Sequence, residues 1–264
     1  MVSRIAHAAD IPPGLSAVSL HPDARASASP PVLGEEVAVV LLAQINPRSR
    51  LWGWWRIARG GRSLRGEPGL RFAKALGSGH EGGFGLRPSS SRQGLFALFE
   101  SEAAADRFLQ ESVTLRQFRA RSVELCTVKL RAWSCRGHWS GRSMQPSAPA
   151  PLAADGPVRV AALTRASIHP LRALAFWRKA PPAEVSLAQA PGCLLAAGLG
   201  EAPVLRQATF SIWDSVAAMD AYARSGAHLA AIKAAHREGY FSESMFVRFL
   251  PLAIQGQWKG VVYG

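Results

Sequence analysis

Histidine is the residue in this sequence best suited to metal or redox chemistry, because a neutral imidazole binds iron and other transition metals. The chain has 264 residues and seven histidines. His228 and His236 are eight positions apart (236 − 228) on one predicted helix. The rise of 1.5 Å per residue separates them by about 12 Å, so at most one of them can bind a given metal. His169 precedes Pro170 at the end of a predicted strand. The alternative for each of these histidines is an ordinary surface residue.

Other catalytic signatures are missing from the sequence. It contains no nucleophile elbow, Walker loop, dinucleotide-binding fingerprint or HExxH motif. The glycines from Gly77 to Gly85 lie between predicted strands and no Gly-Lys-Ser/Thr follows them, which favours a turn over a phosphate loop. Several carboxylates fall at predicted helix starts, where the helix dipole stabilises acids without any catalytic role: Glu100, Asp106, Asp214 and Asp220.

The charge of the chain indicates an anionic partner without identifying one. Lys and Arg exceed Asp and Glu by 31 to 18, a net charge of +13, while a hydrophobic content of 48% is typical of a globular protein. No nucleic-acid-binding motif accompanies this charge, so we do not expect nucleic acid as a partner. The cysteines Cys126, Cys135 and Cys193 form no CxxC pair, and no apolar run is as long as a membrane span. We therefore expect a cytoplasmic protein with reduced cysteines.

The two halves of the chain repeat one another. Residues 92–106 align without a gap on residues 206–220, at a constant offset of 114 (206 − 92). Three more pairs of features follow in matching order: Pro47 and Trp54 with Pro170 and Trp177, Gly77-Ser-Gly79 with Gly198-Leu-Gly200, and Gly137-His-Trp-Ser-Gly141 with Gly256-Gln-Trp-Lys-Gly260. This order predicts an internal duplication.

Each half has the pattern strand, helix, strand, strand, helix, strand. Apolar and β-branched runs predict the first strands at Val37–Ile45 and Val158–Ile168, and Ser101 and Ser215 are predicted to cap the second helices. The predicted fold class is α+β, with two tandem ferredoxin-like βαββαβ halves packed as a dimeric α+β barrel within one chain. We expect a disordered tail at 1–36, halves at 37–144 and 158–264, and a Pro-rich linker at 145–157.

The first predicted helix, residues 48–59, mixes three tryptophans with four arginines, a composition typical of helices at a membrane interface. We expect Trp52, Trp55, Arg56 and Arg59 to provide peripheral contact with the inner face of the cytoplasmic membrane. The alternative is that Trp54 belongs to the core, like its repeat partner Trp177, and that Trp52 and Trp55 are merely exposed.

Several segments together resemble the spheroidene monooxygenase family over residues 37–260. They are Gly77-Ser-Gly79, Arg136-Gly-His-Trp-Ser-Gly141, Ala162-Leu-Thr-Arg-Ala166, Phe176-Trp177, Gly198-Leu-Gly-Glu201 and Gln207-Ala-Thr-Phe-Ser-Ile-Trp213. The resemblance implies an O₂-dependent monooxygenase that hydroxylates and then ketolates an acyclic carotenoid. It also implies haem iron as the cofactor and ferredoxin as the electron donor.

The resemblance also suggests site residues. It implies His228 as the iron ligand, Arg165 as a catalytic residue near a haem propionate or bound oxygen, and Trp177 as a cofactor-binding residue. A long apolar substrate is consistent with a site between or beneath the sheets and with a membrane as its source. Two alternatives remain open: another monooxygenase of the same barrel superfamily, and a non-catalytic module that binds an apolar ligand.

Overall fold

The computed structural model describes residues 35–83, 87–152, 156–179, 187, 189–202, 204–224 and 237–264. The strands and α-helices of the first part are β1 (Val37–Ile45), α1 (Arg50–Arg59), β2 (Leu70–Gly79), β3 (Pro88–Phe99), α2 (Glu102–Glu111), α3 (Val113–Arg121) and β4 (Ser122–Gly137). Those of the second part are β5 (Val160–Ile168), α4 (Ala173–Lys179), β6 (Cys193–Ala202), β7 (Arg206–Trp213), α6 (Val216–Ala223), β8 (Phe241–Trp258) and β9 (Val261–Tyr263).

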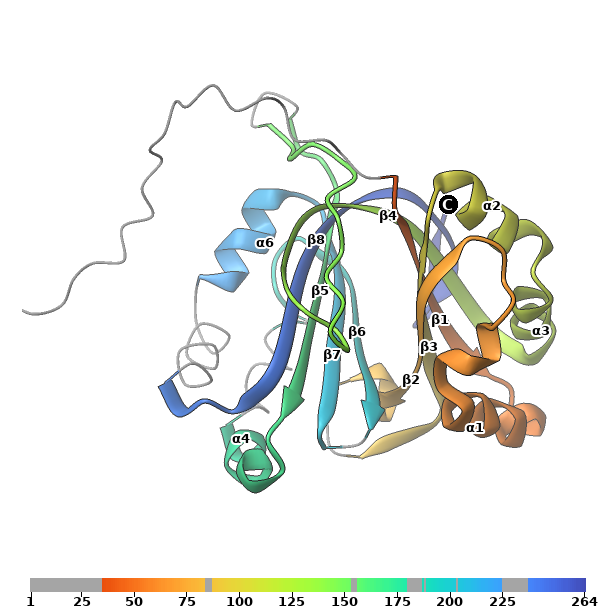
Figure 1. Ribbon diagram of the computed structural model, residues 1–264, viewed down its shortest axis with the longest axis horizontal. Coiled ribbons are helices and arrows are strands. Elements are labelled where there is room, and N and C mark those ends of the chain that lie inside the picture. Colours follow the sequence, from red (N-terminus) through yellow and green to blue (C-terminus); the bar gives the residue numbers. More distant parts are fainter. Residues whose placement is uncertain are drawn as a thin grey trace, which may run out of the picture. The chain divides into compact units, whose positions relative to one another are not determined.

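Eight antiparallel strands close into a barrel, and helices lie outside it (Figure 1). The strand order is β4-β1-β3-β2-β6-β7-β5-β8, and β4 pairs with β8 to complete the ring. The short β9 pairs with the end of β8 as a hairpin that the sequence did not predict. The expected α+β class with a barrel is therefore confirmed.

The two junctions between the halves of the chain differ in length. On one side, β4 and β8 pair along their length, from Cys126 opposite Gly256 to Gly137 opposite Met245. On the other side, β2 and β6 pair only through Gly77 with Gly200 and Ser78 with Leu199. The β2–β6 junction is thus the weaker one, and it has glycines on both strands.

Alternation along the strands separates an inner core from outer cores. In β1, Val40 and Leu42 belong to the cluster inside the barrel, whereas Val39 and Leu41 pack outward beneath α1, α2 and α3. Because both faces of β1 are buried, its sequence is a continuous apolar run instead of an alternating one. The outer face of the second half packs on α4 and α6 through smaller clusters.

The predicted helix caps are present. The second helix predicted for the first half is divided into two helices, α2 and α3. Ser101 Oγ accepts from the Ala104 N–H at 3.3 Å and Ser215 Oγ from the Ala218 N–H at 3.2 Å, as expected of N-cap serines. After α2, Ser112 adopts an extended conformation (φ −62°, ψ 132°) and caps α3 with its own side chain. This extended residue separates α2 from α3.

Residues 1–34 and 153–155 of the expected tail and linker lie outside the described residues. The beginning of the expected linker packs on the barrel. Ser147 donates its N–H to the Ala132 carbonyl at 2.7 Å and its hydroxyl to the Glu36 carbonyl at 2.6 Å. The side chain of Met144 joins the inner core.

The three cysteines are free thiols in the structure, with Cys126 buried and Cys135 and Cys193 partly buried. Burial raises the pKa of the Cys126 thiol to about 12. Within the described part of the chain, no helix has the length and hydropathy needed to cross a lipid bilayer.

Candidate functional site

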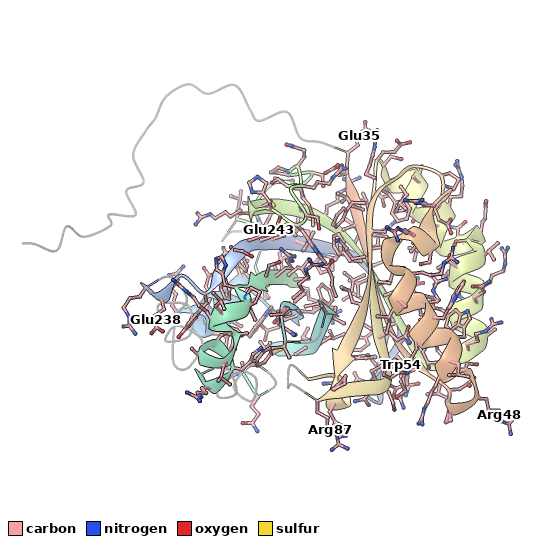
Figure 2. All side chains as sticks on the ribbon, turned by 60° about the horizontal axis from the view of Figure 1, so that its bottom comes forward. Glu35, Arg48, Trp54, Arg87, Glu238 and Glu243 are labelled. Atoms are coloured by element: carbon pink, nitrogen blue, oxygen red, sulfur yellow. The ribbon has the colours of Figure 1, made fainter. Side chains whose placement is uncertain are left out.

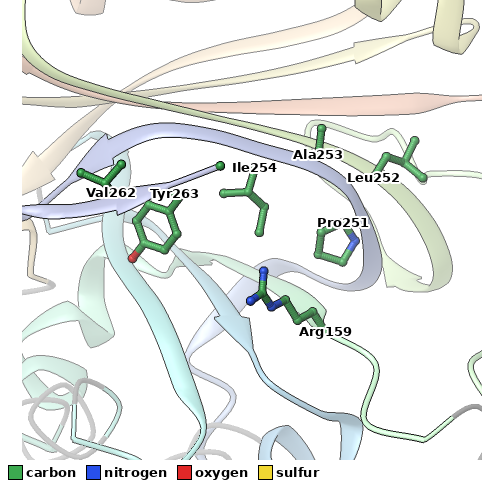
Figure 3. Close-up of a pocket in the computed structure, with 8 residues that line it drawn as sticks. Arg159, Pro251, Leu252, Ala253, Ile254, Val262 and Tyr263 are labelled. Atoms are coloured by element: carbon green, nitrogen blue, oxygen red, sulfur yellow. The ribbon is translucent and has the colours of Figure 1, made fainter.

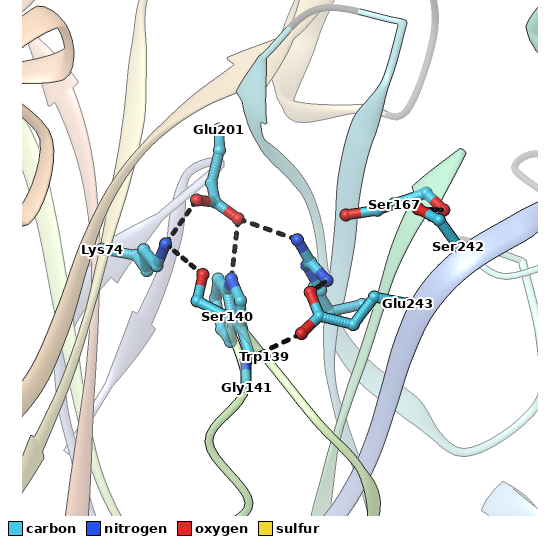
Figure 4. Close-up of polar contacts among 9 residues, drawn as sticks. Lys74, Trp139, Ser140, Gly141, Ser167, Glu201, Ser242 and Glu243 are labelled. Atoms are coloured by element: carbon cyan, nitrogen blue, oxygen red, sulfur yellow. Dashed lines mark hydrogen bonds and ion pairs between the residues drawn. The ribbon is translucent and has the colours of Figure 1, made fainter. Parts of the chain in front are cut away.

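Arg165, the predicted catalytic residue, lies inside the barrel. It follows Ala161 and Leu163 on the inner face of β5, and only 3% of its surface is exposed. Its guanidinium pairs with Glu243 through Nη1 and with Glu201 Oε1 through Nη2, the latter at 3.4 Å (Figure 4). Arg165 Nε has no hydrogen-bond partner among the residues that the structure describes. The cation is thus held between two carboxylates in a water-poor interior.

Glu201, near the end of β6, connects the two halves of the chain. Its Oε2 lies 2.7 Å from Lys74 Nζ on β2, and its Oε1 accepts a hydrogen bond of 2.7 Å from the Trp139 indole. Burial alone would raise the pKa of Glu201, but the hydrogen bonds from Lys74 and Trp139 outweigh it and hold the pKa below its ordinary value. Glu201 is therefore the ionised centre of the cluster.

The loop from Gly137 to Gly141 closes over this cluster. Gly137 has φ 82°, and a Cβ there would lie 2.1 Å from the Ser244 carbonyl oxygen, so only glycine fits at this position. The loop buries Trp139 to 1% exposure, and the Gly141 N–H donates to Glu243 Oε1 at 2.9 Å. Burial opposes ionisation of Glu243, but hydrogen bonds from the Gly141 and Ser140 N–H groups and the charge of Arg165 lower its pKa.

We call these four charged residues and Trp139 the interior polar cluster: Lys74, Trp139, Arg165, Glu201 and Glu243. Two cations face two carboxylates, so the charges balance. Such a cluster has little free charge of its own, and its members orient one another. Chemically, it gives an otherwise apolar interior a fixed polar end that can align a dipolar or hydrogen-bonding group.

A pocket at the β2–β6 junction shares one residue, Glu201, with this cluster. Its volume is about 260 Å³. The remaining lining comes from α1 and from the two glycine-containing motifs: Trp54, Ile57, Ala58, Gly77, Ser78, Gly79, Pro88, Ser89, Leu199, Gly200, Ala202, Val204 and Gln207. We call it the junction pocket. It is mostly apolar and has one carboxylate in its wall.

A second pocket, of about 280 Å³, lies at the C-terminal hairpin (Figure 3). Arg159, Tyr263 and the segment Pro251 to Ile254 line it. Neither pocket is lined by Arg165 or Trp177. Because the junction pocket shares Glu201 with the interior polar cluster, we take the junction pocket as the candidate site.

The other predicted site residues are not brought together with Arg165. Trp177 on α4 is 9% exposed and packs with Ala173 of the same helix and with Ile168 of β5. It donates its indole N–H to the Val204 carbonyl at 2.8 Å. Ile168 and Arg165 face opposite sides of β5, so Trp177 and Arg165 lie on opposite faces of the sheet. Their predicted roles in cofactor binding and catalysis remain predictions.

The predicted iron ligand cannot be placed, because His228 and also His236 lie outside the described residues. The histidines that are described, His80, His138 and His169, are all exposed. The described residues also include no cluster of three or more His, Cys, Asp or Glu side chains that could hold a metal ion. Among the described histidines, therefore, none is a buried imidazole of the kind that serves as an axial haem ligand.

The expected membrane-contacting set on α1 needs correction. Arg56 is 4% exposed and lies 5.0 Å from the ring centre of Phe118, beside the partly buried Trp52. The alternative prediction placed Trp54 in the core, but Trp54 is 52% exposed. Trp55 is 53% exposed. Helical spacing explains the difference, because Trp52 and Arg56 are four residues apart and share the inward face.

Sequence reasoning did not identify Lys74, Trp139, Glu201 or Glu243 as site residues. A signal was available in the strand alternation, since a charged residue in register with inner-face apolar residues must be paired. Glu243 shares this register with Met245 and Val247. Glu201 and Trp139 were also inside the motifs that resembled the family.

The fold first defines a class. Crystal structures of two aldoxime dehydratases, one in complex with butyraldoxime, are similar to this chain with TM-scores of 0.53 and 0.54. The overlaps cover 82% and 83% of this chain and 81% and 80% of the other chains, at 11% identity. Identity this low shows the fold alone, an α+β barrel shared with enzymes.

Sequence comparison then gives the family. The chain is 55% identical to the spheroidene monooxygenase of Rubrivivax gelatinosus over 263 residues, which cover 100% of this chain and 98% of that protein. It is 37% identical to the one of Rhodobacter capsulatus, over 75% of this chain and 83% of that protein. The chain therefore belongs to the spheroidene monooxygenase family. No family model matches the sequence.

Proposed function

We propose that this protein is a carotenoid monooxygenase that hydroxylates and then ketolates an acyclic carotenoid such as spheroidene, using O₂. The observation that carries the proposal is the 55% identity, along the whole chain, to a protein named spheroidene monooxygenase. The junction pocket supports it, because an apolar pocket ending at a fixed polar cluster suits a hydrocarbon that acquires an oxygen.

The junction pocket would hold only the reacting end of such a substrate. Its volume of about 260 Å³ lies below the roughly 300–1,000 Å³ typical of pockets that enclose drug-sized ligands. Trp54, Ile57 and Leu199 would exclude water around the hydrocarbon. Glu201, held in place by Lys74 and Arg165, would accept a hydrogen bond from a hydroxyl group once it is present.

We also infer that the barrel consists of two tandem ferredoxin-like halves, the single-chain counterpart of a dimeric α+β barrel. The strand order β4-β1-β3-β2 of the first half corresponds to β8-β5-β7-β6 of the second. Both halves place a helix after their first strand and again after their third. These correspondences support the duplication expected from the repeated motifs.

Haem as the cofactor, ferredoxin as the electron donor and the cytoplasmic face of a membrane as the location are part of the same proposal. Haem and ferredoxin come from the family resemblance, and the location comes from the cysteine pattern and from the Trp- and Arg-rich composition of the first helix. Haem iron, when bound, would supply the oxygen activation. His228 is the proposed ligand, and Arg165 would contribute through its position beside Glu201 and Glu243.

The reaction can be tested with the purified full-length protein, haem, a reductant with ferredoxin, and spheroidene under ¹⁸O₂. We expect products heavier by one labelled oxygen, detected by mass spectrometry. Unlabelled products, or unchanged substrate with a haem-loaded protein, would contradict the proposed activity. Unchanged spheroidene bound to a protein that has no Soret band would favour the non-catalytic binding module instead.

The ligand assignment has a separate test. His228→Ala should lose the Soret band of the haem-loaded protein, whereas His236→Ala, a substitution in the same predicted helix, should retain it. A full Soret band in His228→Ala would reject His228 as the ligand and leave the monooxygenase activity open to the ¹⁸O₂ experiment.

A further inference from the structure

Large apolar side chains protrude from two helices that hold corresponding positions in the two halves. On α1, Leu51 is 87% exposed and Trp54 and Trp55 are about half exposed. In the segment that leads into α4, Leu171 is fully exposed, and Leu174 on α4 is 67% exposed. Groups of large exposed apolar side chains on neighbouring elements are uncommon unless they bind something.

The junction pocket connects the two groups. Val204 is exposed, lines the pocket together with Trp54 of α1, and accepts the hydrogen bond from Trp177 of α4. Both helices lie at the lower end of the barrel in Figure 1. We call this region the α1–α4 surface, made of Leu51, Trp54, Trp55, Leu171, Leu174 and Val204.

The segments that carry this surface are purely cationic. Residues 46–66 contain six arginines and no acid, and residues 169–179 contain two arginines, a lysine and no acid. The Arg59 guanidinium stacks 4.5 Å from the ring centre of Trp55, so charge and aromatic surface lie side by side. In Figure 2, the side chains of Arg48 and Arg87 extend outward, with Trp54 between them.

We propose that the α1–α4 surface docks on a lipid bilayer rich in anionic headgroups, with the mouth of the junction pocket facing the lipid. Half-buried tryptophans favour the boundary between headgroups and acyl chains, and the surrounding arginines bind lipid phosphates. Nucleic acid would match the charge but would leave Leu51, Leu171 and Leu174 in water. The pocket's role as substrate site rests on the proposed function; the docking itself does not.

Vesicle flotation of the full-length protein tests the proposal. Vesicles of phosphatidylcholine alone are compared with vesicles of equal parts phosphatidylcholine and phosphatidylglycerol. We expect binding to the anionic vesicles, weakened by salt, together with a blue shift of tryptophan emission. Failure to bind anionic vesicles would overturn the proposal.

Two pairs of matched variants assign the binding to this surface. Neutralising Arg48, Arg50 and Arg62 to Gln should lower vesicle affinity on the order of fivefold per cation. The control neutralises Arg107, Arg116 and Arg119 on α2 and α3 to Gln, which removes the same charge. Leu51→Ser with Trp55→Ser should also lose binding and the blue shift, whereas Val261→Ser with Val262→Ser on β9 should not.

Thermal unfolding of every variant confirms that it is folded before it is compared. Equal losses in both arginine triples would reject a defined surface in favour of diffuse charge. A concentration-dependent dimer that the Leu51/Trp55 variant dissociates would show that a second copy of the chain covers the surface. A protein that binds vesicles but never oxidises carotenoid would overturn only the enzymatic proposal.

Discussion

Arg165 is a charged side chain at a position where its strand neighbours Ala161 and Leu163 are apolar core. A cation with 3% exposure has lost most of its hydration, and the loss is compensated by Glu201 and Glu243 and by the Trp139 ring, whose centre lies 5.8 Å from the guanidinium carbon. Each partner is also tied to something else, Glu201 to Lys74 and Trp139, and Glu243 to the Gly141 N–H. Removing Arg165 would therefore disturb the whole interior polar cluster.

Arg165→Met should destabilise the protein by about 3–5 kcal/mol, because it leaves two partly buried carboxylates with one nearby cation. Urea unfolding of the purified variant measures this. Arg224→Met is the matched control, since Arg224 is 77% exposed in its ion pair with Asp220 and should change stability by roughly 0.5 kcal/mol or less. Similar losses in the two variants would show that burial of Arg165 is not the cause.

Glu201 and Glu243 should make the folded protein sensitive to acid. Both pKa values are lowered in the folded state, so the unfolded chain binds more protons as the pH falls below about 4.3, the ordinary pKa of glutamate. Their stabilisation is complete above that pH and is lost as the pH falls through the folded pKa values. Unfolding free energies between pH 3 and 7 should show a shallower acid slope for Glu201→Gln than for the parent protein. An unchanged slope would contradict this role.

At the scale of elements, the junction between β2 and β6 decides what can enter the barrel from the side of α1. A Cβ at Gly77 would meet nothing closer than 3.8 Å, whereas one at Gly200 would lie 2.9 Å from the Arg206 carbonyl oxygen. The two glycines of the junction therefore have different roles. Gly200 permits close packing of the backbone, and Gly77 keeps the pocket open.

Gly77→Val should fill the junction pocket without backbone strain. We expect weaker substrate binding, seen as a raised KM or a several-fold loss of kcat/KM for the carotenoid, at nearly unchanged thermal stability. Val262→Leu, which adds bulk in the pocket at the C-terminal hairpin, is the control and should leave turnover unchanged. Normal turnover by a folded Gly77→Val protein would place the substrate elsewhere.

The regular elements could be predicted from sequence because period and capping act locally. Val37–Ile45 has the predicted bounds, and Ser101 and Ser215 cap the helices they were expected to cap. Strand alternation could have marked charged residues of the inner face, but the pairing of Lys74 with Glu201 and of Arg165 with Glu243 could not be predicted, because it spans long sequence separations. The predicted orientation of α1 was wrong because composition alone does not distinguish Trp52 from Trp54 and Trp55. Packing of Trp52 against Phe118 determines which tryptophan faces inward.

For the whole molecule, both halves contribute to one inner core. Leu199 of β6 packs over Gly94 of β3, where an added Cβ would lie 2.6 Å from the leucine side chain. The inner cluster contains residues from all eight barrel strands. Neither half could keep its inner face dry by itself.

The protein should consequently unfold in a single cooperative transition. Calorimetric and van't Hoff enthalpies should agree, and Leu199→Ala should shift the entire transition by about 2–5 kcal/mol of stability. Thermal unfolding followed by calorimetry and by tryptophan fluorescence provides the measurement. Two resolved transitions, of which Leu199→Ala moves only one, would mean that the halves unfold separately.

The strand β8 is the longest in the barrel, with 18 residues from Phe241 to Trp258, and it pairs with β5, β4 and β9. It comes after both β4 and β5 in the chain. Until it emerges, β4 and β5 each lack a neighbour, and the nascent chain carries two open sheet edges. The barrel therefore cannot close before β8 has been synthesised, and a premature stop before Phe241 would leave an aggregation-prone product instead of a smaller working enzyme.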